Sequence, residues 1–151
     1  MTKIRADGTV SCPMDERRYR TMREKLESRN GCPVVAAHGD DERFLLAIGA
    51  EAISDEHGIM HLGDIPSASA FFEEIIHFTQ IQKYGSVDSY DAVERAAREI
   101  AANRMLLRNG KAYRFADEEY EEIAANLQYW ESDFQRRVGK SYDESDIKRE
   151  I

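Results

Sequence analysis

One stretch of eighteen residues, 67–84, constrains the fold more than any other part of the chain. It contains neither proline nor glycine, and Gly85 follows it at the position where glycine commonly ends a helix. At about 100° per residue, its aromatic and aliphatic side chains cover well over half of the helix circumference. A helix with so wide an apolar surface is normally buried on most sides. The stretch therefore predicts a central, largely buried helix over 67–84, with Ser67 as its N-cap.

The polar residues of this predicted helix gather on one narrow arc. Glu73, Glu74, His77 and Gln80 lie on it, and no lysine or arginine does. Glu73 and His77 are four residues apart, so they lie one turn apart on the same side and can reach a single metal ion. Glu74 lies beside them and can contact a water molecule on that ion. Glu73 and His77 are therefore candidate metal ligands, and Glu74 is a candidate general base.

This pattern, E-E-x-x-H, resembles the H-E-x-x-H active-site helix of zinc metallopeptidases, with Glu73 in place of the first histidine. In its order of elements, and in the stretches EEIIH and AREIAAN, the run from about 50 to 130 is similar to the small zincin-like domains of bacterial polymorphic toxins and phage-related proteins. The resemblance implies an α+β, zincin-like fold, in which a small N-terminal sheet packs on a central active-site helix and further helices follow. It also implies that the last strand before that helix, here 59–62, borders the substrate cleft.

A further carboxylate, Glu99, is expected on the next predicted helix, which spans 88–109 and is closed by Gly110. Small and apolar residues surround Glu99, whereas Glu94 and Arg98 lie on the opposite, charged face. An unpaired buried charge is costly, so Glu99 is expected to have a partner. The resemblance implies that this partner is the metal, because the third ligand of Glu-type zincins comes from a helix just after the motif helix. A buried salt bridge, for example to Arg95 one turn away, is the structural alternative.

The rest of the chain is predicted to contain short strands between helices. The residues before the central helix have apolar runs bounded by turn residues, and a long amphipathic stripe starts after Asp117. This order predicts an α+β fold whose sheet is contributed by 33–62. The expected helices are 13–29 and 117–137, with Pro13 in the first turn, and the expected strands are 33–37, 44–48, 51–54 and 59–62.

Length, charge and composition narrow the function classes. A chain of 151 residues is most simply one domain, with 1–11 and 139–151 expected to be flexible. The net charge of −8, without a lysine or arginine cluster, argues against nucleic-acid binding. No apolar run approaches the ~20 residues of a membrane span, and 1–10 has no signal-peptide core. The expected location is therefore the cytoplasm, or another cell reached by delivery without a signal peptide. Cys12 and Cys32 are expected to be reduced thiols.

The leading functional hypothesis is a metal-dependent peptidase. Glu73, His77 and Glu99 would hold zinc and leave one position for a water molecule, from which Glu74 takes a proton. Because a carboxylate replaces the first histidine, manganese or iron is also an expected metal. The substrate would be a protein or peptide, and a toxin or phage-associated effector of this kind would have an immunity or partner protein. His61 is a weaker candidate for the cleft.

Two other classes remain as alternatives. The first is a carboxylate-bridged di-iron bundle, because Glu74 and His77 also form an E-x-x-H pair. That fold needs a second E-x-x-H pair, which the sequence lacks, and the strand signals oppose it. The second is a non-catalytic metal-binding or protein-interaction module, such as a degenerate zincin or an adaptor. The metal content of the purified protein would distinguish an adaptor from a metalloenzyme.

Overall fold

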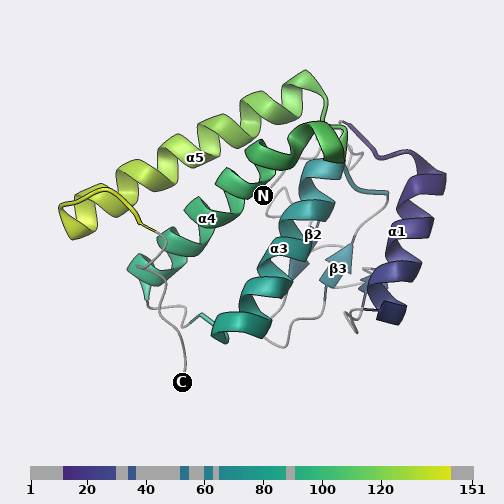
Figure 1. Ribbon diagram of the computed structural model, residues 1–151, viewed down its shortest axis with the longest axis horizontal. Coiled ribbons are helices and arrows are strands. Elements are labelled where there is room, and N and C mark those ends of the chain that lie inside the picture. The colour runs from purple at the N-terminus through teal and green to yellow at the C-terminus, as the bar shows by residue number, and fades with distance from the viewer. Residues whose placement is uncertain are drawn as a thin grey trace. The chain divides into compact units, whose positions relative to one another are not determined.

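The structure is a computed structural model that describes residues 12–29, 34–36, 52–54, 60–62, 65–87 and 91–143. Its helices, labelled in Figure 1, are α1 (Glu16–Arg29), α3 (Ala68–Tyr84), α4 (Ala92–Tyr113) and α5 (Asp117–Val138). Its strands are β1 (Val34–Ala36), β2 (Ala52–Ser54) and β3 (Met60–Leu62).

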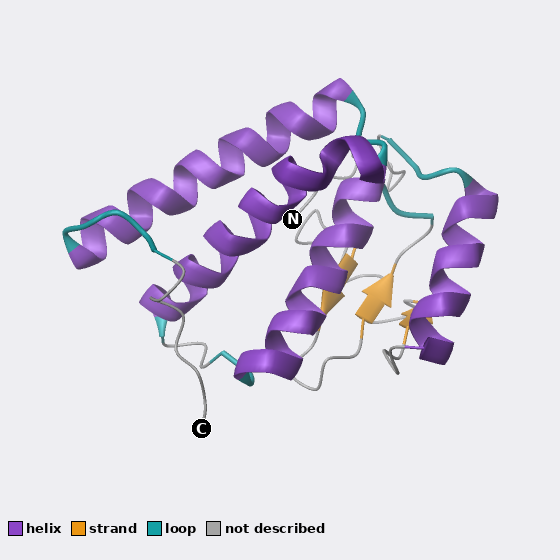
Figure 2. Ribbon diagram, in the orientation of Figure 1, coloured by secondary structure: helices purple, strands orange, loops and turns teal. Residues whose placement is uncertain are grey.

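The described chain is mainly helical, as Figure 2 shows. Its four helices have 14, 17, 22 and 22 residues, whereas each strand has only three. β3 pairs in parallel with β1 and antiparallel with β2. The prediction of an α+β, zincin-like fold with an N-terminal sheet is therefore wrong. Strands typically have about five or six residues, and these short segments do not provide a sheet layer for a central helix.

The helix predictions are largely confirmed. β1, β2 and β3 lie inside the predicted runs 33–37, 51–54 and 59–62, but each strand is shorter than the run that predicted it. Short apolar runs have no distinctive period, so the sequence alone overestimated their extent. The run at 44–48 lies outside the described residues. Among the helices of the described chain, none has an apolar stretch long enough to cross a membrane.

Residue contacts divide the chain into two compact units, Met1–Phe78 and Thr79–Ile151. Helix α3 continues through the boundary without a break. The expectation of a single domain over 1–151 stays a prediction.

The first unit is organised by caps that hold the starts of α1 and α3. Asp15 caps α1, because the N–H of Arg18 donates to its carboxylate oxygen at 2.9 Å. Pro13, expected in the first turn of that helix, instead forms a β-bridge with Ser67. Ser67 is the predicted N-cap of α3, and this is confirmed by the N–H of Ala70, which donates to Ser67 Oγ at 3.2 Å.

The core of the first unit contains aromatic side chains of α1 and α3. The rings of Tyr19 and Phe71 meet edge to face, with centroids 5.6 Å apart, and Phe71 is fully buried. The N–H of Met14 also donates to Pro66 O at 2.7 Å. Phe71, near the start of α3, is thus buried against an aromatic side chain of α1.

The second unit is built on α4 and α5, which pack against each other (Figure 1). Small side chains of α4 leave room for larger ones of α5, so that the helices approach closely. Its core also receives Tyr142, which lies edge to face with Phe134 at 5.7 Å. The buried members of this core are Ala96, Ala97, Ile100, Phe134 and Tyr142.

Gly110 does not close the helix, contrary to the sequence prediction. α4 continues to Tyr113 and ends at Arg114, whose φ of 60° is left-handed. Gly110 is buried, and a Cβ added to it would clash with Cε1 of the Tyr120 ring. The Tyr120 ring is also edge to face with Phe115 at 5.8 Å. The absence of a side chain at Gly110 therefore serves the packing of α5 and not the end of α4.

Gly110→Ala tests this close approach, because two effects oppose each other. Helix propensity favours alanine by about 1 kcal/mol, while overpacking costs about 1–3 kcal/mol. We expect the overpacking to dominate, so the free energy of unfolding falls by about 1 kcal/mol in urea denaturation. In a Tyr120→Ala background the clash is absent, and Gly110→Ala should then stabilise the protein by about 1 kcal/mol. Stabilisation in both backgrounds would show that the ring moves aside freely.

Candidate metal centre

The polar arc of α3 is buried, as the sequence predicted. Glu73, Glu74 and Gln80 have relative exposures of 7%, 6% and 7%. The side chain of His77 is 18% exposed. Carboxylates are rarely buried to this degree without a partner, so the arc is a place of charge compensation and not a solvated surface.

Glu73 and His77 lie at a spacing that suits one metal ion. Nε2 of His77 is 3.6 Å from Oε1 of Glu73, which is longer than a good hydrogen bond. Two ligand atoms at about 2.0–2.2 Å from a tetrahedral zinc ion lie ~3.4 Å apart. The distance between Nε2 of His77 and Oε1 of Glu73 is close to this value.

The electrostatic environment of Glu73 favours its ionised form. Burial raises the pKa of this carboxyl group, but the attraction of His77 and of other positive charge outweighs it. The pKa is lowered as a result from its ordinary value of 4.5 to about 2. Glu73 is therefore an anion throughout the physiological pH range, as a metal ligand must be.

Glu99 is the third member of the group. Its ligand atom and those of Glu73 and His77 all lie within 4.8 Å of one another. Glu99 is half-buried on α4, and its backbone carbonyl accepts a hydrogen bond from Asn103 Nδ2 at 2.8 Å. A group of two carboxylates and one imidazole can in principle bind a divalent metal ion.

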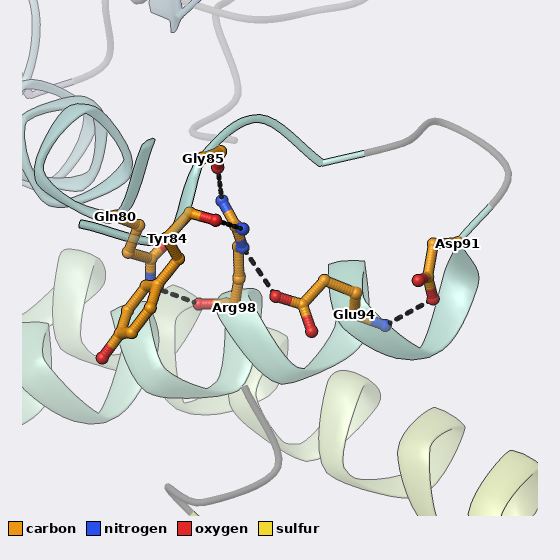
Figure 3. A network of polar contacts seen from close by, with 6 residues as sticks. All are labelled: Gln80, Tyr84, Gly85, Asp91, Glu94 and Arg98. Carbon is orange, nitrogen blue, oxygen red and sulfur yellow. Dashed lines mark hydrogen bonds and ion pairs between the residues drawn. The ribbon is translucent and has the colours of Figure 1, made fainter. Parts of the chain in front are cut away.

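The position of Glu99 follows from contacts at the end of α3. Gln80 Nε2 donates to the carbonyl oxygen of Arg98 at 3.0 Å (Figure 3). Gln80 is three residues after His77 on the unbroken helix α3, and residues at this spacing are neighbours on a helix surface. The peptide that joins Arg98 to Glu99 is thus held beside the same face that carries His77. The guanidinium of Arg95, the alternative partner for Glu99, lies 5.6 Å from the centroid of the Trp130 ring.

The prediction that Glu94 and Arg98 lie on a charged outer face is wrong. Each is only 5% exposed, and Arg98 Nε donates to Glu94 Oε1 at 3.0 Å. Asp91 accepts a hydrogen bond from the Glu94 N–H, also at 3.0 Å, and so caps α4. The i, i+4 spacing of Glu94 and Arg98, three residues after a capping aspartate, is the sequence signal that could have indicated this pair.

The remaining candidates have different outcomes. Glu74 is buried next to Glu73 but is not a member of the group whose ligand atoms converge, so its role as a base stays a prediction. His61 is the middle residue of β3. Cys32 lies outside the described residues, and Cys12 forms no disulfide with another described residue.

No protein-family model, curated protein or solved structure matches this chain. The likeness to zincin-like domains consequently rests on the residues quoted from the sequence, and the site has to be interpreted from its own chemistry.

The lowered pKa of Glu73 predicts a pH-dependent contribution to stability. A group whose pKa is lower in the folded state stabilises the fold above its unfolded pKa, near 4.5, and loses this contribution as the pH falls toward 2. The contribution is at most about 3 kcal/mol. We therefore expect Glu73→Gln to be less stable than wild type at pH 6 and similar to it near pH 2. Urea unfolding in the presence of a metal chelator measures the stability of the two proteins at each pH. A stability difference that does not change with pH would contradict the lowered pKa of Glu73.

Proposed function

We propose that this protein binds a divalent metal ion, zinc in the first place, through Glu73, His77 and Glu99. The convergence of their ligand atoms within 4.8 Å, two of them from one buried helix face, is the observation that supports it. Three protein ligands leave a fourth position on a tetrahedral ion for water, which is the arrangement of catalytic zinc sites. Because the ligand atoms of a tetrahedral zinc ion lie ~3.4 Å apart, zinc binding would draw together any pair of the group that lies farther apart than this.

The donor set bears on which metal is bound. Zinc accepts carboxylate and imidazole ligands, but a set with two carboxylates is hard and negatively charged. Manganese(II) and iron(II) are better suited to a site with two carboxylates and one histidine than to a site with three histidines. The proposal therefore includes manganese and iron as the metals that compete with zinc.

Peptide hydrolysis is the catalytic form of this proposal. A bound metal would acidify a water molecule and polarise the carbonyl group of a protein or peptide substrate. Glu74 would accept the proton of the water and pass it to the leaving amine. Its position next to Glu73 on α3, and its burial, support this role.

A non-catalytic metal-binding or interaction module is the second candidate, and one observation favours it. β3, the strand before α3, pairs with β1 on one side and with β2 on the other. A zincin-type peptidase would need a free strand edge at this place, because an extended substrate adds to such an edge through main-chain hydrogen bonds. Among the described strands, β3 offers no such edge.

Removing one ligand tests metal binding directly. We expect His77→Ala and Glu99→Gln each to weaken Zn²⁺ binding by more than about 100-fold, because loss of a supporting residue alone typically costs about 10–100-fold. Isothermal titration calorimetry on chelator-treated protein measures this. Glu121→Gln, on an exposed position of α5, is the matched control and should bind as wild type does. Unchanged binding in both ligand variants would contradict the site.

Glu74→Gln separates catalysis from binding. The amide keeps the size of the side chain but cannot accept the proton, so peptidase activity should fall by about 10²–10⁴-fold while zinc content stays at the wild-type level. Elemental analysis and cleavage of an unfolded protein substrate measure the two effects. An active Glu74→Gln variant would contradict the catalytic role. If the wild-type protein binds zinc and cleaves no substrate, the non-catalytic candidate is supported.

A further inference from the structure

Arg98 is the most extensively bound of the described cations at the end of α3 (Figure 3). Nε donates to Glu94, and the two terminal nitrogens donate to the carbonyl oxygens of Gly85 and Tyr84. The guanidinium also lies 5.8 Å from the centroid of the Tyr84 ring. These contacts satisfy carbonyl groups that the end of a helix leaves without intrahelical partners, and a cation there also complements the helix dipole.

The main chain of Arg98 is attached to α3 at a second point. Its carbonyl oxygen accepts the hydrogen bond from Gln80, whereas its side chain reaches Tyr84 and Gly85, about one turn further along. These two sets of contacts are about one helical turn apart along α3. Together they fix the position of α4 relative to the end of α3 and the rotation of α4 about its own axis. A lysine could not reproduce the side-chain contacts, because they require the planar, multiple donors of a guanidinium group.

These contacts determine the position of Glu99, because it follows Arg98 in the chain. Gln80, which holds the Arg98 carbonyl, lies on the same face of α3 as His77. A rotation of α4 by one residue, about 100°, would turn Glu99 away from that face.

We propose that Arg98 is a positioning residue of the metal centre: by its side chain and its carbonyl it holds α4 on the end of α3 and thereby keeps Glu99 within reach of the ion. This inference rests on the proposed metal binding. Arg98 itself provides no ligand, and the Glu94 carboxylate neutralises its buried charge.

Two variants break the two attachments separately. Arg98→Lys keeps the positive charge but loses the planar guanidinium group, whose nitrogens donate to several acceptors at once. Gln80→Leu keeps a similar side-chain size but removes the hydrogen bond to the Arg98 carbonyl oxygen. The controls are Arg108→Lys on α4 and Gln82→Leu on α3, both at exposed positions. Co²⁺ is the probe, because its visible absorption reports coordination geometry as well as affinity.

We expect Arg98→Lys and Gln80→Leu to weaken Co²⁺ binding by about 10–100-fold and to change the intensity of the Co²⁺ bands, while both controls remain at wild-type values. Because Arg98 acts through Glu99, the effects should not be additive. Glu99→Gln should weaken binding much less in the Arg98→Lys or Gln80→Leu background than in the wild-type chain. If Arg98→Lys does not fold, Gln80→Leu decides the question.

Two results would overturn the inference. Folded variants that bind Co²⁺ as tightly as wild type, or losses that simply multiply with that of Glu99→Gln, would show that Arg98 has a structural role only. Failure of the wild-type chain itself to bind Co²⁺ would overturn the proposed function, and this inference with it. The two failures are distinguished by the wild-type titration.

Discussion

Helix α3 is buried over most of its first three turns, including the positions of Glu73 and Glu74. Every polar group on a buried helix surface has to be compensated, because a buried charge without a partner is strongly destabilising. Glu73, Glu74 and Gln80 are all buried on this helix, and each is therefore a point where the surrounding structure must provide a donor or a positive charge. His77 does this for Glu73, and the backbone of α4 accepts the amide of Gln80. A metal ion at Glu73, His77 and Glu99 would complete the same compensation.

Charge compensation at the end of α3 also explains the start of α4. Asp91 caps the helix, Glu94 follows in its first turn, and Arg98 one turn later connects Glu94 to the last carbonyls of α3. The ion pair of Glu94 and Arg98 lies within α4, so the donation by Arg98 to the carbonyl oxygens of Tyr84 and Gly85 determines the register in which α4 meets the end of α3. In this protein the register matters because the residue after Arg98 is Glu99.

Much of α3 could be predicted from the sequence because the signals there are local. Ser67 caps the helix, Gly85 ends it with a φ of 83°, and the polar arc follows from the helical period. The i, i+4 spacing of Glu94 and Arg98 indicates that the two side chains can pair, but it does not indicate their burial, because only tertiary contact decides which face of α4 is covered. Gly110 was misinterpreted as a stop for the same reason, since its role is to admit the Tyr120 ring. The α+β fold class was wrong because short apolar runs do not show how long a strand will be.

We propose that three side chains, two from α3 and one from α4, bind one metal ion. Anomalous diffraction at the zinc absorption edge, from crystals of the zinc-loaded protein, tests it most directly. We expect one strong anomalous peak about 2.0–2.2 Å from ligand atoms of Glu73, His77 and Glu99 together. A peak bound by other residues, or no peak near α3 in zinc-loaded crystals, would contradict it.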